Sequence, residues 1–284
     1  MKLLVFGKSG QVARELQRRV PAGTELICLD RASADLSKPQ DCARIIHETK
    51  AELVVNAAAW TAVDAAETHA AEAMVINADA PAAMAWAAAD RGLPFVHLST
   101  DYVFDGAGDA PFLPESPTAP LGVYGQTKRA GEIAVMQAGG RFAILRTSWV
   151  ISAHGSNFVK TMRRLGAERD ALSVVADQIG GPTPAAAIAD AVFTVAQALR
   201  EGAAGGVYHF AGAPDASWAD LARAVMAGSG LSCQIRQIST AEYPTPARRP
   251  LNSRLDCSRL EADFGIPRPD WRQGLAQILS ELAG

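Results

Sequence analysis

The sequence predicts an α/β protein: a doubly wound parallel sheet of the Rossmann type, with a smaller C-terminal α/β lobe. Three observations lead to this prediction. Apolar runs of strand length alternate with helix-length segments, which is the pattern of βαβ units. These runs are apolar on consecutive residues, as in strands buried on both faces. A glycine-rich turn follows the first run directly, at Gly7.

The first half of the chain contains the regular part of this pattern. The expected strands are 2–6, 25–29, 53–56, 94–99 and 142–146. The expected helices between and after them are 11–20, 40–49, 71–91 and 124–138. Because βαβ crossovers are right-handed, these elements form one parallel sheet with helices on both faces.

The alternation of strands and helices becomes less regular past residue 150. Helices are expected at 156–166, 185–200, 217–228 and 272–282, with short strands at 172–176, 207–210 and 233–238. We expect two domains: residues 1–150 bind a dinucleotide, and residues 151–284 form mainly a substrate-binding lobe. Residues 178–200 are expected to return to the first domain.

Composition narrows the class of protein. Of the 284 residues, 49% are hydrophobic and 20% are charged, which suits a chain that buries a sizeable core. The formal net charge is -3 and no basic run exceeds a pair, so nucleic-acid binding is not expected. No segment approaches the roughly 20 uninterrupted apolar residues of a membrane span, and no secretory signal is recognisable. We expect a cytoplasmic protein without membrane contact.

The cysteines and histidines give no sign of a metal site. Cys28, Cys42, Cys233 and Cys257 stand singly and are expected to be reduced thiols. His154 and His209 lack partners at metal-type spacing and are expected to be structural or solvent-facing.

The turn after the first strand, residues 7–13, reads GKSGQVA and opens a helix. Gly7 and Gly10 let the backbone approach a pyrophosphate, and the helix N-terminus offers it free N–H groups. Asp30 closes the second strand, where a carboxylate accepts hydrogen bonds from an adenosine ribose and favours NADH. Arg31 beside it suits the 2′-phosphate of NADPH, so the use of either coenzyme stays open.

Tyr124 and Lys128 form the candidate catalytic pair. Four residues apart in a helix, they share one face, where the lysine cation stabilises a phenolate. Thr100 and Asp101 follow an apolar strand, and the carboxyl ends of such strands are where doubly wound sheets bind ligands. Thr100 is therefore expected to be the third member, hydrogen-bonding the substrate oxygen alongside Tyr124.

The chain resembles the extended short-chain dehydrogenase/reductases, and among them the dTDP-4-dehydrorhamnose reductases. The resemblance rests on segments in the right order along nearly the whole chain: GKSGQVARELQ, VVNAAAWTAVDAAE, STDYVFDG, YGQTKRAGE, LRTSWV, NFVKTM, DQIGGPT and YPTPARRPLNSRLD. It implies reduction of the 4-keto group of dTDP-6-deoxy-L-lyxo-4-hexulose to dTDP-L-rhamnose. A 4-keto reductase or epimerase acting on another sugar nucleotide, or a coenzyme-binding regulatory subunit without turnover, remain alternatives.

The same resemblance implies roles for single residues. Thr100, Tyr124 and Lys128 would be catalytic, and Asp101 and Trp149 would face the sugar. The coenzyme contacts would be Gly10, Gln11 and Val12 at the pyrophosphate, Asp30 at the ribose, Asp35 and Leu36 at the adenine, and Ala59, Trp60 and Thr61 at its middle. Tyr124 and Lys128 would also contact the coenzyme, with Lys128 at the nicotinamide ribose.

A nucleoside diphosphate sugar also needs donors for its two negative charges. Arg248, Arg249 and Asn157 are candidates, although an Arg pair in a Pro-rich loop equally suits a solvated turn. Some members of the family dimerise around Mg²⁺ through acidic residues. Ala186 and the early end of the chain make that doubtful here, so a monomer or a homodimer is expected.

Overall fold

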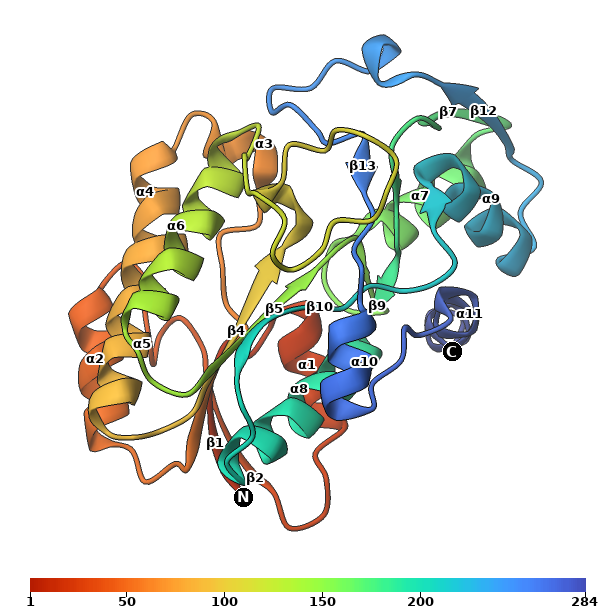
Figure 1. Ribbon diagram of the computed structural model, residues 1–284. Helices are drawn as coiled ribbons and strands as arrows, with labels where there is room; N and C mark the ends of the chain where they lie inside the picture. Colours follow the sequence, from red (N-terminus) through yellow and green to blue (C-terminus); the bar gives the residue numbers. More distant parts are fainter.

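A computed structural model describes residues 1–284, and its centre is one six-stranded parallel sheet (Figure 1). Its strands are β1 (Lys2–Phe6), β2 (Glu25–Leu29), β3 (Leu53–Asn56), β4 (Phe95–Thr100), β5 (Phe142–Thr147) and β10 (Gly206–His209). They lie in the order β10-β5-β4-β3-β1-β2. The predicted strands of the first half are confirmed to within a residue, because fully buried apolar runs leave little choice of element.

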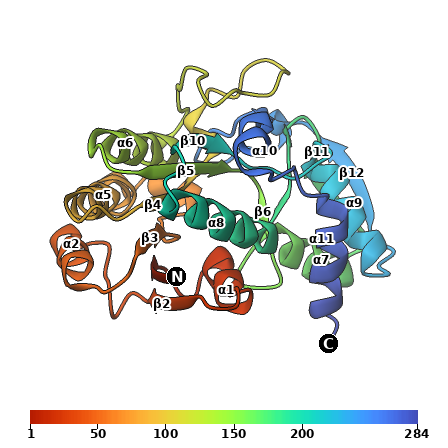
Figure 2. The same ribbon diagram turned by 60° about the horizontal axis from the view of Figure 1, so that its bottom comes forward.

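Helices cover both faces of this sheet, as Figure 2 shows. On one face lie α2 (Pro39–Glu48), α5 (Ala80–Asp90) and α6 (Val123–Gln137). On the other lie α1 (Gln11–Arg18), α8 (Ala185–Arg200) and α10 (Ser258–Phe264). Each face encloses its own apolar core, built around Phe6 and Phe95 on the first face and around Leu3 and Val192 on the second. This is the predicted doubly wound architecture.

The segment predicted as one helix over 71–91 is three pieces. It comprises α4 (Ala70–Met74), the π-helical turn η1 (Val75–Asp79) and α5. A π-turn inserts an extra residue into a helix and is frequent at functional sites. Here it carries Asn77, whose side chain is fully buried.

The smaller lobe packs beside the sheet on the right of Figure 1. Its helices are α7 (Phe158–Glu168), α9 (Trp218–Gly228) and α11 (Trp271–Glu281). Its strands are β6 (Val150–Ile151), β7 (Ala171–Val175), β8 (Ile179–Gly180), β9 (Thr183–Pro184), β11 (Ala216–Ser217), β12 (Gln234–Ile238) and β13 (Asn252–Ser253). Three one-turn helices complete the chain: α3 (Val63–Ala66), η2 (Asp101–Val103) and η3 (Thr240–Glu242). A third apolar core, centred on Trp271, holds the lobe together.

The chain crosses between the two parts several times. After β6, α7, β7, β8 and β9 in the lobe, α8 and β10 return to the large sheet, where β10 pairs in parallel with β5. The chain then builds β11, α9, β12 and β13, and α10 returns once more to cover β10. The sequence did not predict α10, a short helix whose only fully buried side chain is Leu260. No helix of the protein is long and apolar enough to span a membrane.

Candidate active site

The glycine turn lies at the carboxyl edge of β1, where the strand order reverses between β1 and β3. This reversal is the point at which doubly wound sheets bind their ligands. Gly7 has φ +119°, and a Cβ there would approach the backbone of Ala57 to 3.3 Å, so only glycine suits the position. Gly10 caps α1 without any side-chain hydrogen bond to the helix, which leaves the N–H groups of its first turn to face an anion.

Asp30 follows β2 and is held as a carboxylate. Its Oδ1 accepts hydrogen bonds from Ser33 N at 3.0 Å and Ser33 Oγ at 2.8 Å, and Lys8 Nζ lies 3.4 Å from Oδ2. These bonds, those from Ser33 first, lower the pKa of Asp30. Arg31 is exposed and lies 3.7 Å from Asp35, while Leu36 is buried beneath this edge. The sequence-predicted adenosine contacts thus lie together along one edge.

The loop after β3, which contains Ala59, Trp60 and Thr61, is fastened by Asn77. Trp60 N donates to Asn77 Oδ1 at 2.8 Å, and Asn77 Nδ2 donates to Trp60 O at 3.1 Å and to Thr127 Oγ1 at 3.1 Å. Asn77 therefore ties the loop to α6, the helix of the catalytic pair. Sequence reasoning assigned no role to this residue, and its only signal was an isolated amide in an alanine-rich segment.

Thr100 and Tyr124 meet at the carboxyl edge of β4. Thr100 ends that strand, Tyr124 lies in the first turn of α6, and the Thr100 hydroxyl lies close enough to the phenol to oppose the rise of its pKa. A Cβ at Gly125 would lie 2.2 Å from Tyr102 O, so glycine lets α6 come this close to the strand. Burial raises the pKa of Tyr124 above its ordinary value, which keeps the phenol protonated and able to donate a proton.

Lys128 lies one turn further along α6 and is almost wholly buried. Its Nζ donates to Leu98 O at 2.8 Å and lies 3.3 Å from His97 Nε2. Burial lowers the pKa of Lys128 to about 8, against the opposing effect of Glu132. The amine therefore changes charge close to neutral pH.

Asp101 is a buried carboxyl beside Thr100. Its Oδ1 accepts a hydrogen bond from Thr100 Oγ1 at 3.0 Å, and its buried Oδ2 has no hydrogen-bond partner. Burial raises the pKa of Asp101 to about 6, although Ser253 of β13 and Thr100 act in the opposite direction. The carboxyl is therefore a buried titratable group directly beside Thr100.

Trp149, which lies between β5 and β6, is the one non-glycine residue with positive φ, at 48°. Its ring stacks on Trp218 with centroids 3.7 Å apart. Backbone strain of this kind persists only where the surroundings fix it and is concentrated at functional sites. Trp149, just after strand β5 of the large sheet, and Trp218, at the start of α9 in the lobe, thus form a stacked aromatic pair.

The three proposed diphosphate donors differ in their surroundings. Asn157 caps α7, where its Oδ1 accepts from Lys160 N, and its Nδ2 donates to Gln11 Oε1 at 2.9 Å. It therefore lies beside the glycine turn. Arg249 pairs with Asp64 of α3 at 2.8 Å and lies near the Tyr102 phenol, whereas Arg248 is exposed.

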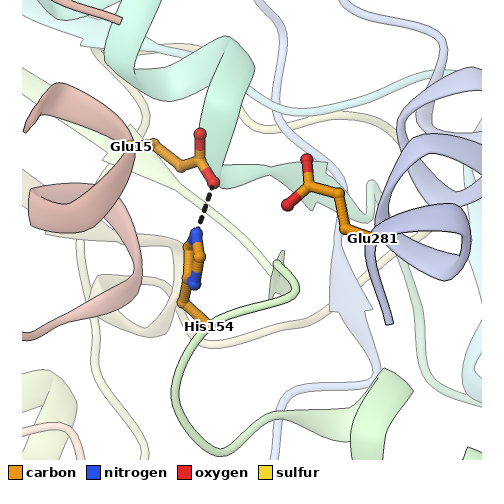
Figure 3. Close-up of side chains that lie close together, drawn as sticks. All are labelled: Glu15, His154 and Glu281. Carbon is orange, nitrogen blue, oxygen red and sulfur yellow. Dashed lines mark ion pairs between the residues drawn. The ribbon is translucent and has the colours of Figure 1, made fainter. Parts of the chain in front are cut away.

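The structure gives His154 two acidic neighbours that no sequence spacing predicted. Figure 3 shows His154 with Glu15 of α1 and Glu281 of α11, and their ligand atoms lie within 4.8 Å of one another. These residues are far apart in the sequence, so no spacing pattern reveals them. Arg18 Nη1 already lies 3.0 Å from Glu15 Oε1 and 2.8 Å from Glu281 Oε2, so one guanidinium forms ion pairs with both carboxylates.

These residues do not fit a magnesium site. Mg²⁺ prefers six oxygen ligands, whereas this cluster offers an imidazole and already holds a guanidinium. Ala186, which lines the adjoining pocket with Glu15 and Glu281, supplies no ligand atom. We therefore assign no catalytic step to a metal at this cluster.

The fold and the site together define a Rossmann-fold oxidoreductase of the short-chain dehydrogenase/reductase type. The family model described as the RmlD substrate binding domain matches residues 1–283. The dTDP-4-dehydrorhamnose reductase of Sinorhizobium fredii is 44% identical over 98% of this chain and 97% of its own. The chain belongs to the dTDP-4-dehydrorhamnose reductase family.

Solved structures agree with this assignment. A dTDP-4-dehydrorhamnose reductase from Clostridium acetobutylicum superimposes with a TM-score of 0.95 and 34% identity, covering 100% of both chains. One from Bacillus anthracis, solved in complex with NADP, has a TM-score of 0.92 and 32% identity, covering 99% of both chains. The resemblance inferred from the sequence segments is confirmed.

Proposed function

We propose that this protein reduces the 4-keto group of dTDP-4-dehydro-L-rhamnose to give dTDP-L-rhamnose, with NADPH or NADH as the hydride donor. The observation that supports the proposal is that Thr100 and Tyr124 lie close together at the carboxyl edge of β4, with Lys128 one turn further along α6. Bound coenzyme would supply the hydride to the carbonyl carbon. The family relationship supports the choice of sugar.

The protein's own groups act on the carbonyl oxygen, where negative charge develops as the hydride arrives. Tyr124 donates its proton to that oxygen, and Thr100 hydrogen-bonds the same atom. The charged form of Lys128 stabilises the phenolate that Tyr124 becomes. Asp101 and Trp149 would orient the sugar, the first by accepting a hydroxyl and the second by packing against the ring.

The coenzyme would lie across the strand reversal between β1 and β3. We assign the pyrophosphate to Gly7, Gly10, Gln11 and Val12, the ribose to Asp30, the adenine edge to Asp35 and Leu36, and the middle of the molecule to Ala59, Trp60 and Thr61. The NADP complex of the Bacillus anthracis relative supports NADPH as one coenzyme. Four free thiols support a reducing compartment such as the cytoplasm.

The direct test is coenzyme oxidation with the 4-keto sugar nucleotide made in situ and the product identified. Oxidation of one NADPH or NADH for each dTDP-L-rhamnose formed is the expected result. Sugar inversion without net coenzyme oxidation would indicate an epimerase instead. Coenzyme binding without turnover would indicate a regulatory subunit. Dehydration is disfavoured because Tyr102 follows Asp101 where related dehydratases have an acidic residue.

Asp30→Ala is expected to change coenzyme preference without changing the chemical step. Removing the carboxylate removes both a ribose acceptor and the repulsion of a 2′-phosphate beside Lys8 and Arg31. The KM for NADH should rise and the ratio of kcat/KM for NADPH over NADH should increase severalfold. An unchanged ratio would place the ribose contact elsewhere.

Arg249→Ala is expected to weaken sugar-nucleotide binding, and Arg248→Ala is the matched control. Arg249 lies at Asp64 and Tyr102 beside the catalytic residues, whereas Arg248 is exposed. Losing one charge-assisted contact to the diphosphate should raise the KM for the sugar nucleotide about tenfold or more, with the KM for NADPH unchanged. Equal effects of the two substitutions would contradict this assignment.

A further inference from the structure

A buried hydrogen-bond network leads from Lys128 into the sheet, and its other members, His97 and Asn56, have no role assigned so far. Lys128 Nζ lies 3.3 Å from His97 Nε2, and His97 Nδ1 lies 3.2 Å from Asn56 Nδ2. Asn56 and His97 are cross-strand partners on β3 and β4. At the far end Ala58 N donates to Asn56 Oδ1 at 3.1 Å. The side chains of Asn56, His97 and Lys128 are all at most 2% exposed.

The backbone amide of Ala58 determines which group donates and which accepts in each of these hydrogen bonds. Ala58 N–H can only donate, so Asn56 presents its oxygen to Ala58 and its NH₂ group to His97. His97 Nδ1 then accepts, and the ring proton lies on Nε2. A proton on Nε2 points at Lys128 Nζ, which must therefore accept. Only the neutral amine has the lone pair to do so.

Protonation of Lys128 exchanges donor and acceptor in the hydrogen bonds of His97 with Lys128 and with Asn56. An ammonium has three N–H donors and no acceptor, so His97 Nε2 must accept and the ring proton must lie on Nδ1. Asn56 must then turn its oxygen toward His97, which leaves its NH₂ group facing the Ala58 N–H. One backbone hydrogen bond is lost, which lowers the pKa of Lys128 by about half to one unit.

His97 itself stays neutral in both arrangements. Burial, and after it the positive charge of Lys128, holds the pKa of His97 well below its usual range. The charged groups around the pair are few: Glu132 of α6 acts on Lys128 and is itself neutralised by Arg146 of β5, and Asp101 of η2 acts on Tyr124. The ring can therefore change tautomer but not charge.

We propose that His97 and Asn56 are positioning residues that couple the charge of Lys128 to the direction of a hydrogen-bond chain ending at the Ala58 amide. The proposal rests on the proposed function, since the charge of Lys128 matters there for the phenolate of Tyr124. It also connects that charge to the Ala59–Thr61 loop, because Ala58 lies at the start of that loop. The change of His97 from one tautomer to the other is the observable sign of this coupling.

The first test is a pH titration of ¹⁵N-histidine-labelled protein without coenzyme, followed by NMR of the imidazole nitrogens from about pH 6.5 to about pH 9.5. His97 is assigned by the loss of its signals in His97→Leu, or in His97→Gln should the former not fold. The proton should move from Nδ1 at low pH to Nε2 at high pH, with a midpoint near the Lys128 pKa of about 8. A single tautomer throughout, or an imidazolium at low pH, would overturn the proposal.

His209 is an internal control for this titration. Its Nδ1 lies 3.1 Å from Phe112 O and its Nε2 lies 3.3 Å from Arg146 Nη1. It is also buried and neutral, because burial lowers the pKa of His209 to about 3. Its partners never change charge, so it should keep the proton on Nδ1 over the whole range.

The second test is Asn56→Asp, which nearly preserves shape and replaces the amide with two acceptor oxygens. The carboxylate accepts from Ala58 N–H and from His97 Nδ1–H together, so His97 should stay in the Nδ1–H form at every pH. The basic limb of the kcat/KM profile should move up by about half to one pH unit or more. A limb that does not move would overturn the proposal.

The control places Asn56→Asp in a His97→Leu background. Without the ring to transmit the effect, the added carboxylate should move the basic limb much less. An equal movement with and without His97 would show that the new charge acts across space and would overturn the role of the ring. The tautomer titration needs no substrate, so it tests the proposal even if the protein proves inactive on the 4-keto sugar.

Discussion

Tyr124→Phe is expected to reduce kcat about 10² to 10⁴-fold while leaving coenzyme affinity intact. The substitution removes only the hydroxyl that gives its proton to the reduced oxygen, and the ring keeps its edge contact with Tyr102, 5.4 Å away between centroids. Stopped-flow oxidation of NADPH gives kcat, and quenching of protein fluorescence gives the coenzyme Kd.

Tyr102→Phe is the matched control for this prediction. It deletes a neighbouring phenol of similar burial, whose pKa burial raises to about 12, but one that lies outside the set of Thr100, Tyr124 and Lys128. Its kcat should stay close to that of the unmodified protein. A Tyr124→Phe variant that keeps more than about a tenth of kcat would mean that another group supplies the proton.

Arg146→Met is expected to destabilise the fold by about 3 to 5 kcal/mol. Arg146 Nη2 and Nε lie 2.7 and 2.9 Å from the two oxygens of Glu132, and both side chains are at most 4% exposed. Removing the guanidinium leaves a buried carboxylate without its partner. Urea unfolding at neutral pH gives the free energy, and the loss should shrink toward acid pH as the unpaired Glu132 becomes protonated.

The double variant Arg146→Met/Glu132→Leu distinguishes two causes of the lost stability: the loss of the ion pair and the burial of an unpaired Glu132 carboxylate. Replacing both members by apolar side chains of similar size should recover most of the stability, because the desolvation cost of the carboxylate disappears with it. If the double variant is as unstable as Arg146→Met, the destabilisation comes from the other Arg146 partners, Pro114 O and His209. The stranded Glu132 carboxylate would then not be the cause of the lost stability.

Local patterns predicted the sheet well, and they also suggested the catalytic set. The strands are buried apolar runs, and Tyr124 and Lys128 lie one helical turn apart, so a few consecutive residues contain the signal. The role of Asn77 was missed because its side chain finds its partner, Trp60, only in the folded structure. The same is true of His97 and Asn56, which become partners only through strand register.

Adjacent residues of one type also cannot be ranked from the sequence. Arg248 and Arg249 were equal candidates, and only the path of their loop turns Arg249 toward Asp64. The histidine at 154 shows the same limit, because Glu15 and Glu281 reach it from opposite ends of the chain. Contacts made by tertiary folding leave no spacing in the sequence to read.

The repeated crossing of the chain makes the two parts inseparable by a single cut. A fragment ending at residue 150 would lack β10 and α8, and so would bare the edge of β5 and the apolar face formed by Leu3, Val5 and Val55. Unpaired strand edges and large apolar faces promote aggregation. A fragment meant to isolate either part would therefore need segments from both halves of the chain, since β10 and α8 complete a sheet and an apolar face begun by the first 150 residues.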